Sequence, residues 1–180
     1  MNFDLEILEF IQNYLRNDVF DAIMPLITKL GDRGMIWIIS SVLLLLFPGT
    51  RKAGAAVAAS LILEALCCNV ILKPFAARPR PFQVNTEVQL LIPPLLDYSF
   101  PSGHTGAAFA AASALFFMKS RLWIPALILS VLMGFTRLYL YVHYPSDVLA
   151  GALLGILSGW IGNRLIRGLG GRRGHSPRED

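Results

Sequence analysis

Long apolar runs alternate along the chain with short stretches that hold most of its charged residues. A helix needs about 20 apolar residues to cross the roughly 30 Å hydrocarbon layer of a membrane. Runs that reach or approach this length cover residues 35–47, 53–72, 106–118, 122–141 and 147–166, and a weaker run covers residues 20–30. The pattern predicts an all-α integral membrane protein in which six helices form a bundle.

The N-terminal segment has a different pattern. Apolar residues recur there at roughly helical spacing between acidic ones, from Phe3 to Leu15. This spacing predicts an amphipathic helix that lies at the membrane interface or leads into the first span. No basic region precedes an apolar core, so the segment is not expected to be a cleavable signal peptide.

Small residues are dense in two of the runs, at residues 54–59 and 106–112. Such faces let helix backbones approach closely, so a compact bundle is expected. The two cysteines, Cys67 and Cys68, are adjacent inside an apolar run. They are expected to pack between helices, because neighbouring helical positions point in different directions and form no disulfide framework.

At 180 residues the chain is expected to form one domain. We place this membrane domain at residues 1–167 and a basic, disordered cytoplasmic tail at residues 168–180. The composition is 54% hydrophobic and 16% charged, with a mean hydropathy of +0.55, which excludes an ordinary soluble domain. A net charge of +4 gives no reason to expect a nucleic-acid partner.

Basic residues in the short loops predict the orientation. If the spans alternate in direction, one set falls on a single side of the membrane, which the positive-inside rule makes cytoplasmic. This set comprises Arg51, Lys52, Lys119, Arg121, Arg164, Arg167, Arg172 and Arg173. Three polar motifs then share the other side, which predicts a site on the extracytoplasmic face of the cell membrane.

The first motif follows the second of the long runs and extends from Lys73 to Pro81. Its prolines stiffen the chain, and a fixed lysine and arginine, Lys73 and Arg80, can neutralise and orient phosphoryl oxygens. The alternative is that these side chains extend to lipid headgroups, as basic residues at helix ends often do. This stretch alone leaves both interpretations open.

The second motif, Pro101 to His104, opens an apolar helix. Free backbone N–H groups at a helix N-terminus attract phosphate, and Gly103 permits close approach. Ser102 can cap the helix and donate to a phosphoryl oxygen, while His104 can protonate a leaving oxygen. The alternative is a capped helix start with an interfacial histidine.

The third motif joins Arg137, at the end of one span, to His143 and Asp147 at the start of the next. Pro145 suits the first helical position, which leaves His143 before the helix and Asp147 in its first turn. The carboxylate can then fix the imidazole tautomer and leave the other nitrogen free to attack. The alternative is an acidic residue that stabilises the helix start beside a passive histidine.

Together the motifs resemble the type 2 phosphatidic acid phosphatase family, whose pattern is Lys-x6-Arg-Pro, Pro-Ser-Gly-His and Ser-Arg-x5-His-x3-Asp. The chain matches each element between Lys73 and Asp147. One departure is mild: the serine that leads the third element is Thr136 here, which keeps the hydroxyl.

The resemblance implies a phosphohistidine phosphatase. His143 looks like the nucleophile and Asp147 like the group that orients it, while His104 looks like the acid for the leaving group and then the base for water. The residues that look like the phosphate cradle are Lys73, Arg80, Ser102, Gly103 and Arg137. Such a cationic shell stabilises charge on the transferring phosphoryl group, so no metal cofactor is expected.

The expected substrate is a lipid phosphate or diphosphate held in the bilayer. Undecaprenyl diphosphate is the first choice, because the small size and outward site resemble bacterial members that act on it. Phosphatidylglycerophosphate, phosphatidic acid and lipid A phosphates are alternatives, since the motifs bind phosphate and not the tail. A transporter or scaffold is the non-enzymatic alternative, disfavoured because the polar groups gather at helix ends and not at the midplane. The oligomeric state is not indicated.

Two features lie outside the motifs. Glu64 lies within a span, where a charge is costly and marks a functional candidate. It precedes Lys73 by nine residues, about 13 Å along a helix, so a structural role, protonated or hydrogen-bonded, is expected and not a contact with phosphate. The loop at residues 82–100 contains an apolar stretch at 90–96, which is either a wedge for a lipid tail or a loop packed on the bundle.

Overall fold

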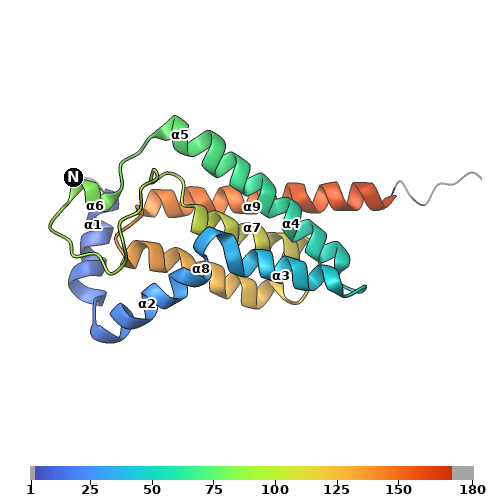
Figure 1. Ribbon diagram of the computed structural model, residues 1–180, viewed down its shortest axis with the longest axis horizontal. Helices are drawn as coiled ribbons and strands as arrows, with labels where there is room; N and C mark the ends of the chain where they lie inside the picture. The colour runs from blue at the N-terminus through green and yellow to red at the C-terminus, as the bar shows by residue number, and fades with distance from the viewer. Residues whose placement is uncertain (1–2, 172–180) are drawn as a thin grey trace, which may run out of the picture.

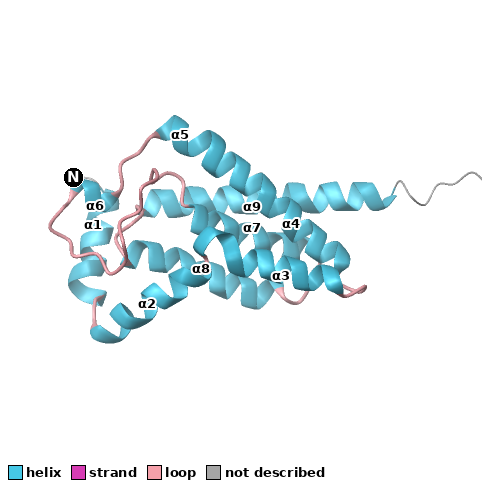
Figure 2. Ribbon diagram, viewed as in Figure 1, coloured by secondary structure: helices cyan, strands magenta, loops and turns pink. Residues whose placement is uncertain are grey.

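The computed structural model describes residues 3–171, with side chains to residue 169. Within that range the chain forms helices and loops and no strand (Figure 1, Figure 2). The elements in order are α1 (Phe3–Phe10), the π-helix η1 (Ile11–Leu15), α2 (Asp18–Leu30), the 3-10 helix η2 (Asp32–Gly34), α3 (Met35–Leu46), α4 (Arg51–Ala65), the π-helix η3 (Leu66–Leu72), α5 (Lys73–Ala76), α6 (Pro81–Val84), α7 (Gly103–Phe117), α8 (Trp123–Tyr139) and α9 (Pro145–Gly171).

Each of the six predicted runs is helical, and the all-α class is confirmed. The boundaries follow local chemistry: Asn17 caps α2 by accepting from the Phe20 N–H, and Ser102 caps α7. The predicted tail begins too early, since residues 168–171 continue α9. The rest of that tail, 172–180, lies outside the described residues.

Two helical stretches, Arg51–Val84 and Pro145–Leu169, are long and apolar enough to cross a membrane, and Trp123–Tyr139 is a shorter apolar helix. Core helices of soluble proteins can also meet that criterion. Here, however, large apolar side chains point outward along several helices, which a soluble protein rarely tolerates. They include Ile39, Leu43 and Leu46 on α3, Ile128 and Val131 on α8, and Leu149, Leu153 and Leu157 on α9. The number of spans remains a prediction.

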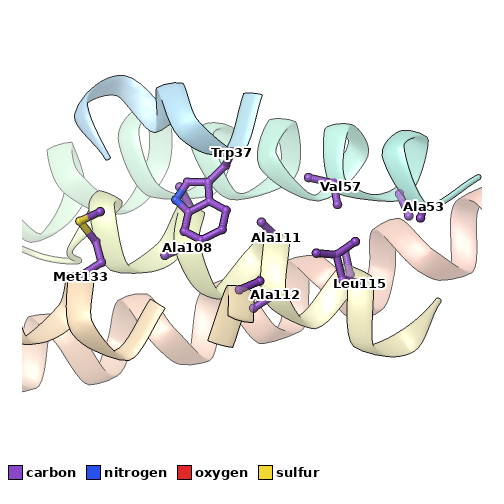
Figure 3. Close-up of a cluster of buried hydrophobic side chains, with 12 residues drawn as sticks. Trp37, Ala53, Val57, Ala108, Ala111, Ala112, Leu115 and Met133 are labelled. Atoms are coloured by element: carbon purple, nitrogen blue, oxygen red, sulfur yellow. The ribbon is translucent and has the colours of Figure 1, made fainter. Parts of the chain in front are cut away.

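The core of the bundle is built around α7, which packs against α4, α8 and α9 (Figure 3). Alanines of α7 lie between larger side chains such as Trp37, Val57 and Met133. On α9, a Cβ atom at Gly151, Gly155 or Gly159 would come within 3.0 Å of atoms of α7 or of its N-cap Ser102. Glycine at every fourth position therefore brings the two backbones into direct contact, as the small-residue runs predicted.

The two ends of the bundle differ in chemistry. At one end, Arg167 donates to the carbonyl of Phe117, close to the α7–α8 loop, and the first turn of α4 lies at the same end (Figure 1). The opposite end carries α1, α2, α6 and the long loop before α7, shown in Figure 2. The basic loop residues and the three motifs thus lie at opposite ends. Which end faces the cytoplasm remains a prediction.

The loop at residues 85–100 and the N-terminal helix close over the motif end. Leu91, Ile92 and Leu95 pack on a cluster that includes Leu140 and Val142. Leu8 of α1 is fully buried against the tyrosines that flank His143. In the apolar stretch 90–96, Leu96 by contrast is completely exposed. Most of this stretch is therefore packed on the bundle, and Leu96 is the side chain of the stretch that is free to insert into lipid.

Candidate active site

The three motifs meet around one cavity at the motif end of the bundle. The cavity has a volume of about 440 Å³. Motif residues that line it are Lys73, Arg80, Gly103, His104, Arg137 and His143. The co-location inferred from alternating spans is thus present in the structure at the level of single side chains.

His143 lies in the short turn between α8 and α9, with its ring held between two groups. Its Nδ1 lies 3.5 Å from Oδ2 of Asp147, in the first turn of α9. Its Nε2 lies 3.2 Å from Nη1 of Arg80. As expected from the sequence, the carboxylate faces one ring nitrogen, whereas the other nitrogen faces Arg80, a contact that the sequence did not predict.

Asp147 is fully buried and is held by donors on both oxygens. Oδ2 accepts from the Ser99 hydroxyl at 2.5 Å and from the Tyr144 N–H at 2.9 Å. Oδ1 accepts from Nη1 of Arg78 at 2.6 Å, and the same guanidinium also donates to Asp4. Because these bonds fix the carboxylate, they also fix the group that orients His143.

The environment of His143 favours its neutral form. Burial lowers the pKa of the imidazole to about 3, although the contact with Asp147 raises it. The charges of Arg80 and Arg137 lower the pKa further. At neutral pH the ring is therefore unprotonated on one nitrogen, which is the form that can act as a nucleophile.

Arg80 is almost completely buried and is anchored by backbone oxygens. Its Nε donates to the Asp97 carbonyl at 2.8 Å, and Nη1 donates to the Val142 carbonyl at 2.7 Å. Nη2 donates to the Asp97 carboxylate at 2.7 Å. A guanidinium held this way presents a fixed positive charge beside Nε2 of His143.

Asp97 lies between two of the predicted phosphate ligands. One carboxylate oxygen pairs with Lys73 and the other with Arg80. Burial alone would raise the pKa of Asp97, but the hydrogen bond from Lys73 and the charge of Arg80 lower it to about 2. The carboxylate is half exposed to solvent and lies between the two cations, Lys73 and Arg80, where a bound anion would also lie.

Arg137, a predicted member of the phosphate cradle, keeps free donors. It is 1% exposed, and one of its Nη atoms, Nη1, donates to the Thr28 hydroxyl. Its Nε and Nη2 atoms are buried and have no hydrogen-bond partner within residues 3–169. Buried guanidinium donors without a partner are costly, so these two point to a ligand oxygen in the adjoining cavity.

His104 stands in the first turn of α7 at another wall of the cavity. Its Nε2 lies 3.0 Å from Oδ1 of Asp32 in η2, and Gly31 lies so close to its ring that a Cβ there would clash. The contact with Asp32 leaves Nδ1 as the nitrogen that can serve a leaving group.

Of the two predicted phosphate ligands at the start of α7, Ser102 and Gly103, only Gly103 lines the cavity. The Ser102 hydroxyl lies 2.9 Å from the Thr105 hydroxyl, and Ser102 does not line the cavity. Its cap of α7 is present, while its contact with phosphate remains a prediction. Gly103 does line the cavity, and a Cβ there would meet Cys68 and Asn69 at ordinary distances of 3.6 and 3.8 Å. These neighbours do not by themselves require glycine there, and its contact with phosphate remains a prediction.

The sequence did not predict several residues that complete the site. Asp97 and Ser99 lie in an irregular loop, and Asp32 lies in a short turn, so no periodicity marked them. The hydroxyl of Thr136 donates to the Met133 carbonyl and does not reach the site. Glu64, which was expected to lie too far from Lys73 to contact phosphate, lines the same cavity as Lys73.

Comparison with known proteins agrees with this geometry. The family model for the PAP2 superfamily matches residues 53–169. The chain belongs to the PAP2 superfamily. It is a membrane phosphatase, and therefore a hydrolase, and the resemblance drawn from the three motifs is confirmed.

Individual relatives cover most of the chain. An undecaprenyl-diphosphatase of Sulfolobus acidocaldarius is 35% identical over 156 residues, which are 86% of this chain and 74% of the relative. The crystal structure of LpxE from Aquifex aeolicus superposes with a TM-score of 0.80 at 30% identity, covering 91% of this chain and 96% of that one. A transmembrane PAP2-type phosphatidylglycerolphosphate phosphatase from Bacillus subtilis gives 0.72 at 25% identity, covering 98% and 87%.

Proposed function

We propose that this PAP2 phosphatase hydrolyses a lipid phosphate or diphosphate in the cavity through a phosphohistidine on His143, without a metal cofactor. The observation that carries the proposal is the pair of unpartnered buried donors on Arg137, beside the neutral imidazole of His143. Together with Lys73 and Arg80 they supply positive charge on the side of the cavity where a phosphoryl group would face Nε2.

In the first step, Nε2 of His143 attacks phosphorus and the bond from phosphorus to the leaving oxygen breaks. The electron pair of that bond stays on the leaving oxygen, which takes a proton from Nδ1 of His104. Burial and the charge of Arg137 lower the pKa of His104 to about 4, and Asp32 opposes this shift and so favours the charged form that donates the proton. Asp147 stabilises the positive charge that develops on the ring of His143.

In the second step, His104 takes a proton from water, and the hydroxide oxygen attacks the phosphorus of the phosphohistidine. The phosphorus–nitrogen bond breaks, inorganic phosphate leaves and His143 returns to its starting form. Throughout both steps Lys73, Arg80 and Arg137 neutralise charge on the non-bridging oxygens. The Asp97 carboxylate must leave Lys73 and Arg80 to admit the phosphoryl group.

The first-choice substrate is undecaprenyl diphosphate, and its hydrolysis would take place in a multi-pass protein whose site faces the extracytoplasmic side of the cell membrane. Similarity to the undecaprenyl-diphosphatase of Sulfolobus supports this choice. Phosphatidylglycerophosphate, phosphatidic acid and lipid A phosphates are the alternatives. Similarity to the phosphatidylglycerolphosphate phosphatase of Bacillus supports the first, and similarity to a lipid A 4'-phosphatase of Bacteroides thetaiotaomicron supports the last.

The test is phosphate release by the detergent-solubilised protein, in chelator, over a panel of lipid phosphates and diphosphates. Wild type is compared with His143→Ala and with the control Lys119→Ala, which removes a basic side chain at the opposite end of the bundle. Release by wild type and Lys119→Ala, lost in His143→Ala, supports the mechanism. Equal release by all three proteins, or none from any lipid, would overturn it.

A further inference from the structure

Besides Asp97, three polar residues line the cavity without belonging to any of the three motifs. They are Arg33 in η2, Glu64 in α4 and Asn69 in η3. Each lies near the wall that carries His104: Arg33 follows Asp32, the partner of His104, and Asn69 lies beside Gly103. The proposed mechanism uses none of them.

Glu64 reaches this cavity because of the π-helix that follows it. Nine residues of an α-helix make about two and a half turns, which would place Glu64 and Lys73 on opposite faces. The i→i+5 pattern of η3, Leu66–Leu72, puts more residues in each turn and rotates Lys73 back onto the face of Glu64. Asn69, between them, shares this face, since all three line the cavity.

The carboxyl group of Glu64 is built into the protein and has a free oxygen. The side chain is 3% exposed and packs so closely on α7 that a Cβ at Gly106 would overlap it. Its Oε1 atom has no hydrogen-bond partner, and no ion pair involves Glu64 among the described residues. Burial favours the neutral form of a carboxyl group, and a neutral carboxyl group carries an O–H donor.

Arg33 brings a positive charge to the same wall. Its backbone lies in the left-handed region, with φ of 53°, and Gly34 follows at 71°. Arginine rarely adopts this conformation, and such strain is often found at functional sites. Within the described part of the chain its guanidinium makes no hydrogen bond or ion pair, so it is available to an anion that enters the cavity.

The in-line geometry of phosphoryl transfer decides which part of the substrate lies beside these three residues. In phosphoryl transfer the attacking and leaving atoms lie roughly in line, on opposite sides of phosphorus. With His143 as nucleophile, the leaving group lies toward His104, and so toward Arg33, Asn69 and Glu64. A plain alkyl group placed there would cover an arginine and a free carboxyl oxygen without giving either a partner, which is unfavourable.

We propose that Arg33, Asn69 and Glu64 form a subsite for a second phosphate, the leaving group of a diphosphate lipid. This inference rests on the proposed function and adds a preference for diphosphates over monophosphates. His143 takes the terminal phosphoryl group, the phosphorus–oxygen bond to the inner phosphate breaks, and the electron pair leaves on that phosphate as a lipid monophosphate. Arg33 neutralises its charge, and Glu64 donates a hydrogen bond to it.

The first test compares farnesyl diphosphate with farnesyl phosphate, which share one tail. The readout is the ratio of kcat/KM for the two substrates in wild type, Arg33→Gln, Glu64→Gln and Glu64→Leu. We expect the ratio to fall at least tenfold in Arg33→Gln and Glu64→Leu, and to stay within threefold of wild type in Glu64→Gln, which keeps a neutral donor. Arg121→Gln, at the opposite end, serves as the charge-matched control.

A ratio unchanged in Arg33→Gln, or lowered equally in Arg121→Gln, would overturn the subsite. Equal loss in Glu64→Gln and Glu64→Leu would show that Glu64 is not a neutral donor. A second test needs no variant: methylenediphosphonate should inhibit wild-type hydrolysis of farnesyl phosphate at least tenfold more tightly than inorganic phosphate does. Equal inhibition by the two would also refute the subsite.

The outcomes separate this inference from the proposed function. If wild type hydrolyses monophosphates as well as diphosphates and His143→Ala does neither, the phosphohistidine mechanism stands and the subsite fails. If wild type hydrolyses neither substrate class, the proposed function itself fails.

Discussion

Nη1 of Arg80 lies 3.2 Å from Nε2 of His143, so the proposed nucleophile and a cation of the cradle are in direct contact. The contact has two effects. It holds a positive charge where the oxygens of an attacked phosphoryl group would lie, and it disfavours a proton on the imidazole. A single guanidinium therefore serves both substrate and nucleophile.

This contact predicts how stability depends on pH. Burial and the neighbouring arginines lower the pKa of His143 from its ordinary 6.5 to about 3 in the folded protein. Between these values the unfolded chain binds a proton that the folded chain does not, so this part of the free energy of unfolding is complete above pH 6.5 and falls as the pH decreases toward 3. Thermal unfolding of wild type and His143→Gln across this range should show a smaller decline in the variant. Parallel declines would contradict the low pKa.

Asp97→Asn should strengthen phosphate binding. The carboxylate competes with a phosphoryl group for Lys73 and Arg80, and the amide removes its charge at nearly equal size. We expect inorganic phosphate to inhibit the variant about three- to tenfold more tightly. The measurement is the inhibition constant of phosphate at fixed pH. Weaker inhibition would mean that Asp97 organises the two cations more than it competes for them.

Arg78→Gln should lower kcat with little change in KM. Arg78 donates to Asp147 at 2.6 Å and lies 3.8 Å above the ring of Tyr144, so it is a positioning residue for the carboxylate that orients His143. A small misplacement of a reacting group costs about ten- to a hundredfold in rate. Ser146→Ala removes another partner of Arg78 without touching Asp147, and serves as the control. A rise in KM alone would assign Arg78 to substrate binding.

Chelation should leave activity intact. Lys73, Arg80 and Arg137 supply the positive charge that a metal ion gives in other phosphoryl-transfer sites. The assay is phosphate release before and after dialysis against a chelator, followed by addition of magnesium. Activity that strictly requires added magnesium would contradict the proposed role of the cationic cradle.

The helices could be predicted well from the sequence because each is a continuous apolar run with clear boundaries. Residues 106–118 and 122–141, for example, correspond to α7 and α8 within three residues at each end. The π-helix η3 could not be predicted, since a change from i→i+4 to i→i+5 bonding leaves the apolar pattern intact. For that reason the sequence did not indicate that Glu64 and Lys73 line the same cavity.

The site could be predicted only where residues lie at helix ends. His104, Arg137 and Asp147 lie in the first or last turns of helices, so the topology alone brings them together. Asp97 and Ser99 lie in a loop whose course depends on the packing of Leu91 and Leu95. No local pattern encodes such a course, and these partners appear only in three dimensions.

The glycines at every fourth position of α9 have a practical consequence for engineering. They place α9 directly on α7, and the Ser102 N–H donates to the Asp147 carbonyl at 3.0 Å where the two helices begin. The distance between His104 and the turn that carries His143 is therefore set by direct contact between the backbones of α7 and α9. A designer could exchange the lipid-facing side chains of α3 and α8 freely to suit another membrane, whereas one added methyl group on this seam of α9 would move the two histidines apart.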